Sequence, residues 1–370
     1  MLYVNTQSFW KIIENSGKPI VLYGTGDGAD KILDYCGKHN IKVADIFASD
    51  DFLRSGTPKF FRGYEIKKLS KIKEIYGDNC CVLLSFGTRF NMVIEKIYDL
   101  DDNHDFYVPN FPVFGENIYF DAEYYSQNRK DIERVYDLLA DDESRSVYQN
   151  AINFFITGKL EYLRNDIMQN PKEAALDLFD LRDVSYIDLG AYDGDTIFEL
   201  LQHLERKHEV QVKKIYAFEP DTKNFAKLQR NTEQIADICE LYNLGVWSRA
   251  DILTFNAQSN RNSNFDELRA GTGEKTQNIS VDSIDNLLYP RISGDILIKY
   301  DIEGAELEAL IGSKKIIQEY SPNLIVSLYH KTGDIFKLPL YIQSINPRYK
   351  FYMRKHKYIP CWDLNLYAVK

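Results

Sequence analysis

The sequence predicts an α/β protein with two Rossmann-like units, a smaller one followed by a larger one, joined by a helical connector. Apolar strand runs alternate with helical patterns near both ends of the chain, which is typical of parallel sheets covered by helices. The strand signal is absent between them, and 370 residues are more than one core usually needs. We expect boundaries at residues 1–115, 116–183 and 184–370.

The first unit contains two strand-helix pairs. The run KPIVLYG precedes a helical pattern from Asp27 to His39, IKVADIFAS follows, and CCVLLSFG precedes the helical RFNMVIEKIYDL. The turn GTGDGA at 24–29 has the spacing of a dinucleotide-binding loop. Asp27 within it would repel a pyrophosphate. Two interpretations stay open: a nucleotide site, or glycines that only allow a tight turn.

The connector, residues 116–183, is predicted to be helical because apolar side chains recur at helical spacing, as at Ile132, Val135, Tyr136 and Leu139. It is rich in acidic residues. Residues 331–370 instead hold eight basic and two acidic side chains. This basic segment either pairs with the acidic connector or helps to hold a phosphorylated substrate.

The third segment returns to strands and helices. The strand VSYIDLG, a helix from Asp195, the strand KKIYAFEP, the helix FAKLQRNTEQ, and the strand runs CELYNLGVWS, DILIKYDIEG and PNLIVSLYH follow in order. Polar residues end three of these strands, at Glu219, Asp301 and His330. Ligands of open α/β sheets bind at this carboxyl edge, so we expect the site there.

The turn DLGAYDGDT at 188–196 is acidic. Asp188, Asp193 and Asp195 would repel a pyrophosphate, so the loop favours a cationic ligand. S-adenosylmethionine brings an ammonium and a sulfonium. Its ribose hydroxyls need a carboxylate acceptor, and Glu219 is placed to be one.

The strand DILIKYD brings Lys299, Asp301 and Glu303 to the same edge, and His330 ends the next strand. His330 or Asp301 are candidate proton acceptors, and an ion-paired structural Lys299 and Asp301 is the alternative. Asp301, Glu303 and His330 together offer donors suited to a divalent ion. A metal is considered but not favoured.

Composition narrows the functional classes. The net charge of -10 argues against binding to a phosphate backbone. No apolar run is long enough for a membrane span, and the first residues do not resemble an export signal, so we expect a cytoplasmic protein. Five cysteines, an odd number without a CxxC pair, argue against a complete set of disulfides.

Residues 116–370 resemble the FkbM family of S-adenosylmethionine-dependent methyltransferases. The motifs DLGAYDGDT, AFEP, NLGVWS, VDSID and IKYDIEGAELEAL carry this resemblance in the family's order. It implies O-methylation of a sugar or nucleotide sugar in bacterial surface glycan synthesis, with S-adenosylhomocysteine as product. The implied catalytic residues are His330, Asp301, Lys299 and Glu303. The implied cofactor contacts are Asp188, Gly190, Ala191, Tyr192, Asp193, Gly194, Thr196, Glu219, Pro220, Asn243, Gly245 and Asp301.

Two departures and several alternatives accompany the resemblance. Tyr192 stands where many methyltransferases have a third glycine, and Tyr300 stands where an aliphatic residue is usual. The first unit more loosely resembles Rossmann-like domains attached to sugar-modifying enzymes. Alternative functions are a non-catalytic binding or scaffold protein, a methyltransferase of polyketide-type hydroxyls, and an NAD-dependent dehydrogenase or epimerase. The acceptor hydroxyl and the oligomeric state stay open.

Overall fold

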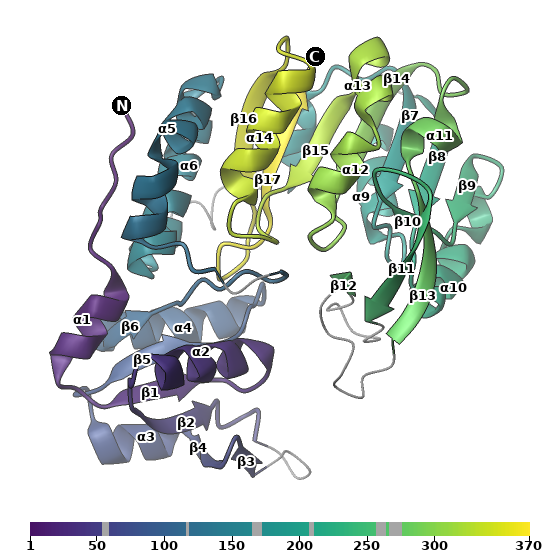
Figure 1. Cartoon of the computed structure of the whole chain (residues 1–370). Coiled ribbons are helices and arrows are strands. Elements are labelled where there is room, and N and C mark those ends of the chain that lie inside the picture. The colour runs from purple at the N-terminus through teal and green to yellow at the C-terminus, as the bar shows by residue number, and fades with distance from the viewer. Residues whose placement is uncertain (54–58, 116–117, 165–171, 207–210, 257–263, 266–275) are drawn as a thin grey trace.

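The computed structural model describes the chain except residues 54–58, 116–117, 165–171, 207–210, 257–263 and 266–275 (Figure 1). The described part contains a six-stranded sheet in the first unit, and a seven-stranded sheet with a small four-stranded sheet in the last. The mixed α/β fold with mostly parallel sheets flanked by helices is therefore as predicted.

The first sheet has the strand order β3-β4-β2-β1-β5-β6, and its neighbouring strands are parallel except β3 and β4. The chain order changes direction between β1 and β5, which is the switch point of a Rossmann-like sheet. Its strands are β1 (Ile20–Tyr23), β2 (Val43–Ala48), β3 (Phe60–Phe61), β4 (Tyr64–Lys68), β5 (Cys81–Leu84) and β6 (Asp105–Tyr107). Its helices are α1 (Phe9–Ser16), α2 (Asp27–Lys38), α3 (Leu69–Tyr76) and α4 (Asn91–Asn103).

The connector forms two helices, α5 (Ala122–Leu138) and α6 (Asp142–Thr157), followed by the short α8 (Lys172–Ala175) and η1 (Leu176–Leu178). Asp121 and Asp141 cap α5 and α6 by accepting hydrogen bonds from backbone amides of their first turns. In Figure 1 both helices lie beside β16 and α14 of the last unit. Arg354 on β16 pairs with Asp141 at 2.7 Å and Glu143 at 3.1 Å, so at this residue the basic segment does contact the acidic connector.

The large sheet has the order β16-β17-β15-β14-β7-β8-β9, with β17 antiparallel to its two neighbours. The central strands β7 and β14 are buried apart from their first residues, as expected for parallel strands covered on both faces. The strands are β7 (Asp183–Leu189), β8 (Gln211–Phe218), β9 (Cys239–Tyr242), β14 (Asp295–Tyr300), β15 (Asn323–Ser327), β16 (Lys350–Lys355) and β17 (Leu364–Val369).

The helices of the last unit are α9 (Asp195–Glu205), α10 (Thr222–Asn231), η2 (Glu233–Ile235), α11 (Ile284–Leu288), α12 (Glu306–Ile311), α13 (Lys314–Tyr320) and α14 (Asp334–Ile345). The small sheet comprises β10 (Gly245–Val246), β11 (Asp251–Asn256), β12 (Asn264–Phe265) and β13 (Thr276–Asp282). The small sheet and the antiparallel pair β16–β17 were not predicted. The division at residues 115 and 183 stays a prediction.

One continuous apolar core links the parts. It contains Phe106 from the first unit, Phe154 from the connector and Phe336 from the last unit, all at most 4% exposed. The loop after β5 also meets the last unit directly, because Thr88 and Ile359 exchange two backbone hydrogen bonds of 2.7 and 2.9 Å. Among the described residues, no helix has both the length and the apolar character needed to cross a bilayer.

Candidate functional site

The candidate site lies at the carboxyl ends of β7, β8 and β14. These strands are adjacent in the sheet, and Leu189 at the end of β7 pairs with Tyr300 at the end of β14. The sequence analysis predicts that the strand before Asp301 lies beside the glycine loop, and this register confirms it. The loops that follow the three strands therefore meet at one edge.

The loop after β7 is built as a close-fitting turn. Gly190 has a φ of +83°, and a Cβ there would lie 2.0 Å from the carbonyl oxygen of Asp301. Tyr192 has a φ of +49°, which is uncommon for a residue with a side chain, and its amide donates to Glu219 Oε2 at 2.9 Å. Gly194, with a φ of +94°, precedes α9. A side chain at Gly190 would separate the two loops.

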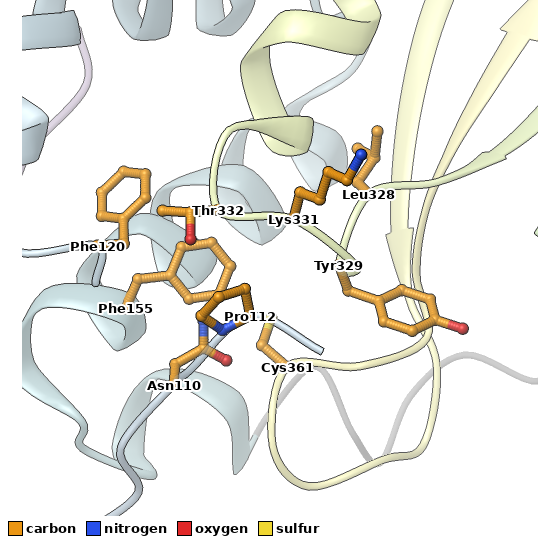
Figure 2. Close-up of a pocket in the computed structure, with 9 residues that line it drawn as sticks. All are labelled: Asn110, Pro112, Phe120, Phe155, Leu328, Tyr329, Lys331, Thr332 and Cys361. Carbon is orange, nitrogen blue, oxygen red and sulfur yellow. The ribbon is translucent and has the colours of Figure 1, made fainter. Parts of the chain in front are cut away.

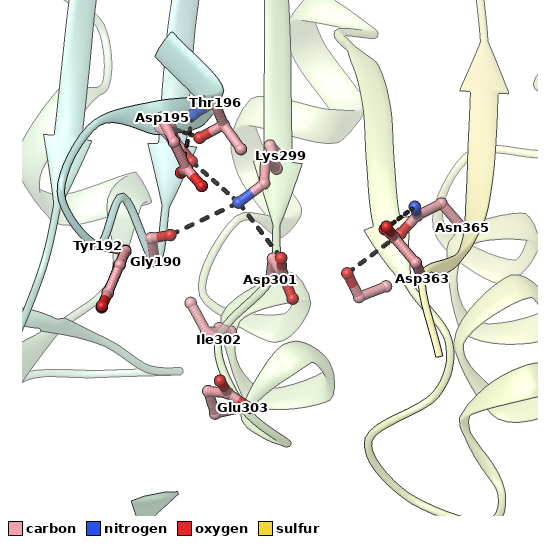
Figure 3. A network of polar contacts seen from close by, with 12 residues as sticks. Gly190, Tyr192, Asp195, Thr196, Lys299, Asp301, Ile302, Glu303, Asp363 and Asn365 are labelled. Atoms are coloured by element: carbon pink, nitrogen blue, oxygen red, sulfur yellow. Dashed lines mark hydrogen bonds and ion pairs between the residues drawn. The ribbon is translucent and has the colours of Figure 1, made fainter. Parts of the chain in front are cut away.

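Asp188 lies beneath this turn rather than on its surface. It is 0% exposed, and it accepts hydrogen bonds from Thr196 Oγ1 at 2.6 Å and from Lys299 Nζ at 3.3 Å. Lys299 also reaches Asp301 Oδ2 at 3.6 Å, as Figure 3 shows. Burial alone would lower the pKa of Lys299, but the carboxylates of Asp188 and Asp301 outweigh it and raise that pKa. These contacts tie the start of α9 and the end of β14 to the end of β7.

Glu219, directly after β8, is the buried carboxylate nearest this turn. It is 6% exposed, and Oε1 accepts from the Asp221 amide at 2.9 Å while Oε2 accepts from Tyr192. Burial raises its pKa to about 7, against the opposing effect of these two amides. Asn243 fixes the same turn by donating to the carbonyls of Glu219 and Pro220 at 2.9 and 3.1 Å. Each Glu219 oxygen keeps a lone pair for a ligand hydroxyl.

The remaining predicted cofactor contacts lie at different depths. Ala191 is buried, and the carbonyl of Asp193 accepts a hydrogen bond from Asn231 at 2.8 Å. Gly245 instead lies in β10 of the small sheet, where it pairs with Val281. Thus the structure brings most of the predicted residues around one turn but places Gly245 in a neighbouring sheet.

The loop after β14 carries two acidic residues, Asp301 and Glu303, and a third, Glu306, follows at the start of α12. Glu303 has a φ of +56° and Gly304 one of +94°. Oε1 of the buried Glu306 accepts from the Ile302 amide at 2.9 Å, which folds the loop back on itself. Asp301 is 32% exposed and accepts from the Tyr329 hydroxyl at 3.1 Å. Glu303 is 36% exposed, so both acids are partly open to solvent.

His330 lies three residues beyond the end of β15 and is 1% exposed. Its Nδ1 contacts Glu306 at 2.8 Å, and its Nε2 lies 3.3 Å from Glu303 and 3.5 Å from Asp301. Burial lowers its pKa, but Glu306 and Glu303 outweigh burial and raise the pKa well above the ordinary value. The imidazolium is therefore favoured at neutral pH. An imidazolium donates from both ring nitrogens, and the role of His330 as a proton acceptor stays a prediction.

A pocket of about 630 Å³, including its open mouth, lies beside Asp301 between the sheet and α9. Its polar wall comes from β7, α9, β14, β15 and β17 and the loops beside them, and Asp363 and Asn365 form its far side in Figure 3. Among its described lining residues, three carboxylates stand against one ammonium, that of Lys299. The polar lining residues are Tyr186, Thr196, Glu199, Lys299, Asp301, Ser327, Asp363, Asn365 and Tyr367.

Sequence reasoning assigned no role to Glu306, Tyr329 or the Ser327–Asn365 pair. Glu306 was within the motif IKYDIEGAELEAL, so its acidic side chain was a visible signal. Ser327 and Asn365 could not be joined without the pairing of β15 with β17, which places them opposite each other. The Ser327 hydroxyl lies 3.2 Å from Asn365 Oδ1.

Two of the three glycines in the GTGDGA turn of the first unit pack against protein, whereas a Cβ at Gly26 would meet nothing within 4 Å. A Cβ at Gly24 would lie 2.5 Å from the Phe86 ring, and one at Gly28 would lie 2.1 Å from the Ser85 carbonyl oxygen. Phe86 in turn packs edge-on against Tyr23. These contacts favour the interpretation in which the glycines allow close packing at the switch point of the sheet.

Asp301, Glu303 and His330 are the residues that the sequence offered as ligands of a divalent ion. In the part of the chain that the structure describes, no group of three or more His, Cys, Asp or Glu side chains is arranged to hold a metal ion.

This chain is similar to several solved structures of methyltransferases. Methyltransferase FkbM from Methylobacillus flagellatus KT superimposes with a TM-score of 0.67 over 95% of this chain and 90% of its own, at 22% identity. A candidate methyltransferase from Streptococcus mutans in complex with SAH gives 0.31 at 14% identity, over 55% of this chain and 99% of its own. An rRNA methylase from Streptococcus thermophilus gives 0.33 at 13%, over 55% and 97%. Of these three similarities, only that to the Methylobacillus flagellatus structure is strong enough to use, and at 22% identity it shows a shared fold. A search of curated proteins gave no match.

The fold is that of the methyltransferase FkbM structure. Residues 188–359 match the model of the methyltransferase FkbM domain, so over those residues this chain is a methyltransferase of the FkbM family. The resemblance carried by DLGAYDGDT and IKYDIEGAELEAL is thereby confirmed.

Proposed function

We propose that this chain transfers a methyl group from S-adenosylmethionine to a hydroxyl of a sugar or nucleotide sugar. The observation that carries the proposal is the cradle formed by Gly190 and Glu219. Gly190 lies against the Asp301 carbonyl with no room for a side chain, and the buried Glu219 carboxylate lies at the end of the next strand. Glycine at this contact lets the loop after β7 pack directly on the loop after β14, which brings Glu219 and Asp301 to one edge of the sheet.

The donor set fits S-adenosylmethionine. Glu219 is placed to accept the ribose hydroxyls, and the acidic turn around Asp193 and Asp195 favours the ligand's positive charge. When bound, S-adenosylmethionine supplies an electrophilic methyl group: the acceptor oxygen bonds to this carbon, the carbon–sulfur bond breaks, and S-adenosylhomocysteine leaves. The residues of this chain orient the two reactants and hold the displaced proton.

Orientation is the larger contribution. Fixing two reactants in line can remove about 7 to 11 kcal/mol from a barrier, whereas a general base contributes about 10² to 10⁴ in rate. In this proposal, the Gly190 turn and Glu219 place the donor, and the pocket beside Asp301 places the acceptor. The Lys299–Asp188 pair holds the two loops in register from below.

Asp301 is our candidate for the group that accepts the hydroxyl proton. Unlike Glu303 and Glu306, it is among the described residues that line the pocket, and its backbone lies against the glycine loop at Gly190. His330, held as an imidazolium by Glu303 and Glu306, positions this loop instead. The proton then moves from the acceptor oxygen to Asp301 as the oxygen–carbon bond forms.

The pocket favours an uncharged, hydroxyl-bearing group of the acceptor. Glu199, Asp301 and Asp363 would repel a phosphate inside it, and Ser327 and Asn365 offer hydrogen bonds to hydroxyls. A nucleotide sugar would therefore place its sugar in the pocket and its diphosphate outside. The surface-glycan role and a cytoplasmic location are further parts of the proposal, and both depend on the family resemblance. A polyketide-type hydroxyl is the alternative acceptor.

The experiment is methyl transfer from labelled S-adenosylmethionine to a panel of free sugars, nucleotide sugars and polyketide alcohols, read by mass spectrometry. We expect label in a sugar or nucleotide sugar, with loss of transfer but not of donor binding in Asp301→Asn. Glu233→Gln, an exposed acid on η2, is the matched control. Donor binding without transfer to any member would favour a binding or scaffold protein and contradict the proposal.

A further inference from the structure

Residues 108–115 follow the first unit and run past the loop after β14, residues 301–306, which we call the acid loop. The segment 108–115 begins after β6, where the Val108 amide donates to the Gly158 carbonyl at 2.8 Å. In Figure 2, Asn110 and Pro112 lie across a narrow pocket from Leu328, Tyr329 and Thr332. This segment, which we call the linker, therefore lies between two parts of the chain that are distant in sequence.

The linker is attached to the first unit through Lys31 of α2. Lys31 Nζ donates to the carbonyls of Pro112 at 3.0 Å and Val113 at 3.2 Å. It also pairs at 2.9 Å with Asp27, which belongs to the GTGDGA turn. The Lys31 side chain is 17% exposed and has three acceptors. Its contact with the linker is therefore better shielded from water than an ion pair on the surface.

The next residue, Phe114, contacts the acid loop. Its amide donates to the His330 carbonyl at 3.1 Å, and its ring centre lies 5.7 Å from that of His330. A Cβ at Gly304 would lie 3.1 Å from the Phe114 Cβ, so the linker packs against the Glu303–Gly304 backbone. Phe114 is 6% exposed and covers His330 from the side of the first unit.

From these contacts we infer that the first unit acts as a clamp on the acid loop, with Lys31 and Phe114 as positioning residues for methyl transfer. The clamp runs from the GTGDGA turn through Lys31 and the linker to Phe114, and from there to His330 and the loop that carries Asp301. This inference rests on the proposed function, because it gives the first unit a role in that reaction.

The loop needs such support because its backbone is strained. Glu303 has a positive φ, which a residue with a side chain keeps only where surrounding contacts over-determine it, whereas Gly304 takes its positive φ without such strain. Glu306 and His330 hold the loop from within the last unit. Phe114 holds it from outside. Figure 2 shows the Tyr329 ring pointing away from Pro112, and its hydroxyl donates to Asp301 on the far side.

Hydrogen exchange of the full-length protein, followed by mass spectrometry, tests the clamp without an acceptor. We compare Lys31→Met, Phe114→Ala and the conservative Lys31→Arg with the parent protein. Lys38→Met is the matched control, because Lys38 is an exposed lysine on the same helix. We expect exchange in peptides covering 301–306 to rise by about tenfold or more in the first two variants, while β7 is unchanged. Lys31→Arg should restore protection.

Three results would overturn the inference: unchanged exchange at 301–306 in both variants, an equal rise in Lys38→Met, or a rise in Phe114→Ala alone. The last would mean that the linker, but not the first unit, supports the loop. Once an acceptor is identified, Lys31→Met should lower kcat by about tenfold or more while the Kd for S-adenosylmethionine stays constant. If the parent protein neither binds nor uses S-adenosylmethionine, the proposed function fails but the exchange result still decides the clamp.

Discussion

Glu219 should make the binding of S-adenosylmethionine depend on pH near neutrality. Burial raises its pKa to about 7 in the free protein, and the ribose hydroxyls need its carboxylate as an acceptor. Affinity should therefore rise as the pH rises through this value and then level off. At pH 6 only about one protein in eleven would carry the ionised form, so Kd should be about tenfold weaker than at pH 8.

The variant Glu219→Gln gives the magnitude of the contact. Hydrogen bonds to a charged group are worth about 1.5 to 3 kcal/mol, which corresponds to about a 10- to 150-fold increase in Kd. Glutamine keeps the size of the side chain but only one acceptor oxygen, so one of the two amides that Glu219 accepts from, those of Tyr192 and Asp221, loses its partner. Glutamine cannot ionise, so the pH dependence should disappear along with the affinity.

Isothermal titration calorimetry at pH 6, 7 and 8 measures both effects. Glu233→Gln, exposed on the same unit, should bind like the parent protein at each pH. An unchanged Kd in Glu219→Gln, with the same pH profile as the parent protein, would refute the ribose assignment.

Three further variants or titrations test other contacts. Gly190→Ala should abolish donor binding, because its Cβ would lie 2.0 Å from the Asp301 carbonyl; calorimetry showing parental affinity would contradict the cradle. The folded pKa of His330 is raised, so its ion pairs stabilise the protein fully below about pH 6.5 and are lost as the pH rises through the folded value. Urea unfolding of His330→Gln should lack this alkaline decline, and a decline equal to that of the parent protein would exclude the effect. NADH fluorescence should show no saturable binding, because Phe86 fills the space at Gly24; saturable binding would restore the nucleotide interpretation.

The sequence predicted the two α/β units well because their central strands are continuous apolar runs. The two central strands of the large sheet have the sequences VSYIDL and DILIKY and are buried almost throughout. Short, continuous apolar runs of this kind are typical of buried parallel strands. The two-residue strands β10 and β12 have no such signal. The pairing of β16 with β17 depends on partners distant from the motifs that were recognised.

The meeting of the strand ends at the candidate site could be predicted, whereas the roles of the residues there stay predictions. Gly190, Glu219 and Asp301 follow strands that the topology makes neighbours, so their meeting could be expected. The protonation state of His330 could not be expected from the sequence, because it depends on Glu306 and Glu303. A loop with positive φ brings these two carboxylates to the two ring nitrogens. Pattern alone also could not show that Asp188 is fully buried under the loop.

A structure of the full chain with S-adenosylhomocysteine tests the central claim most directly. We predict ribose hydroxyls within hydrogen-bond distance of both Glu219 oxygens, and the sulfur on the side of the Gly190 turn that faces Asp301. A ligand bound elsewhere, or one whose ribose lies away from Glu219, would contradict the account.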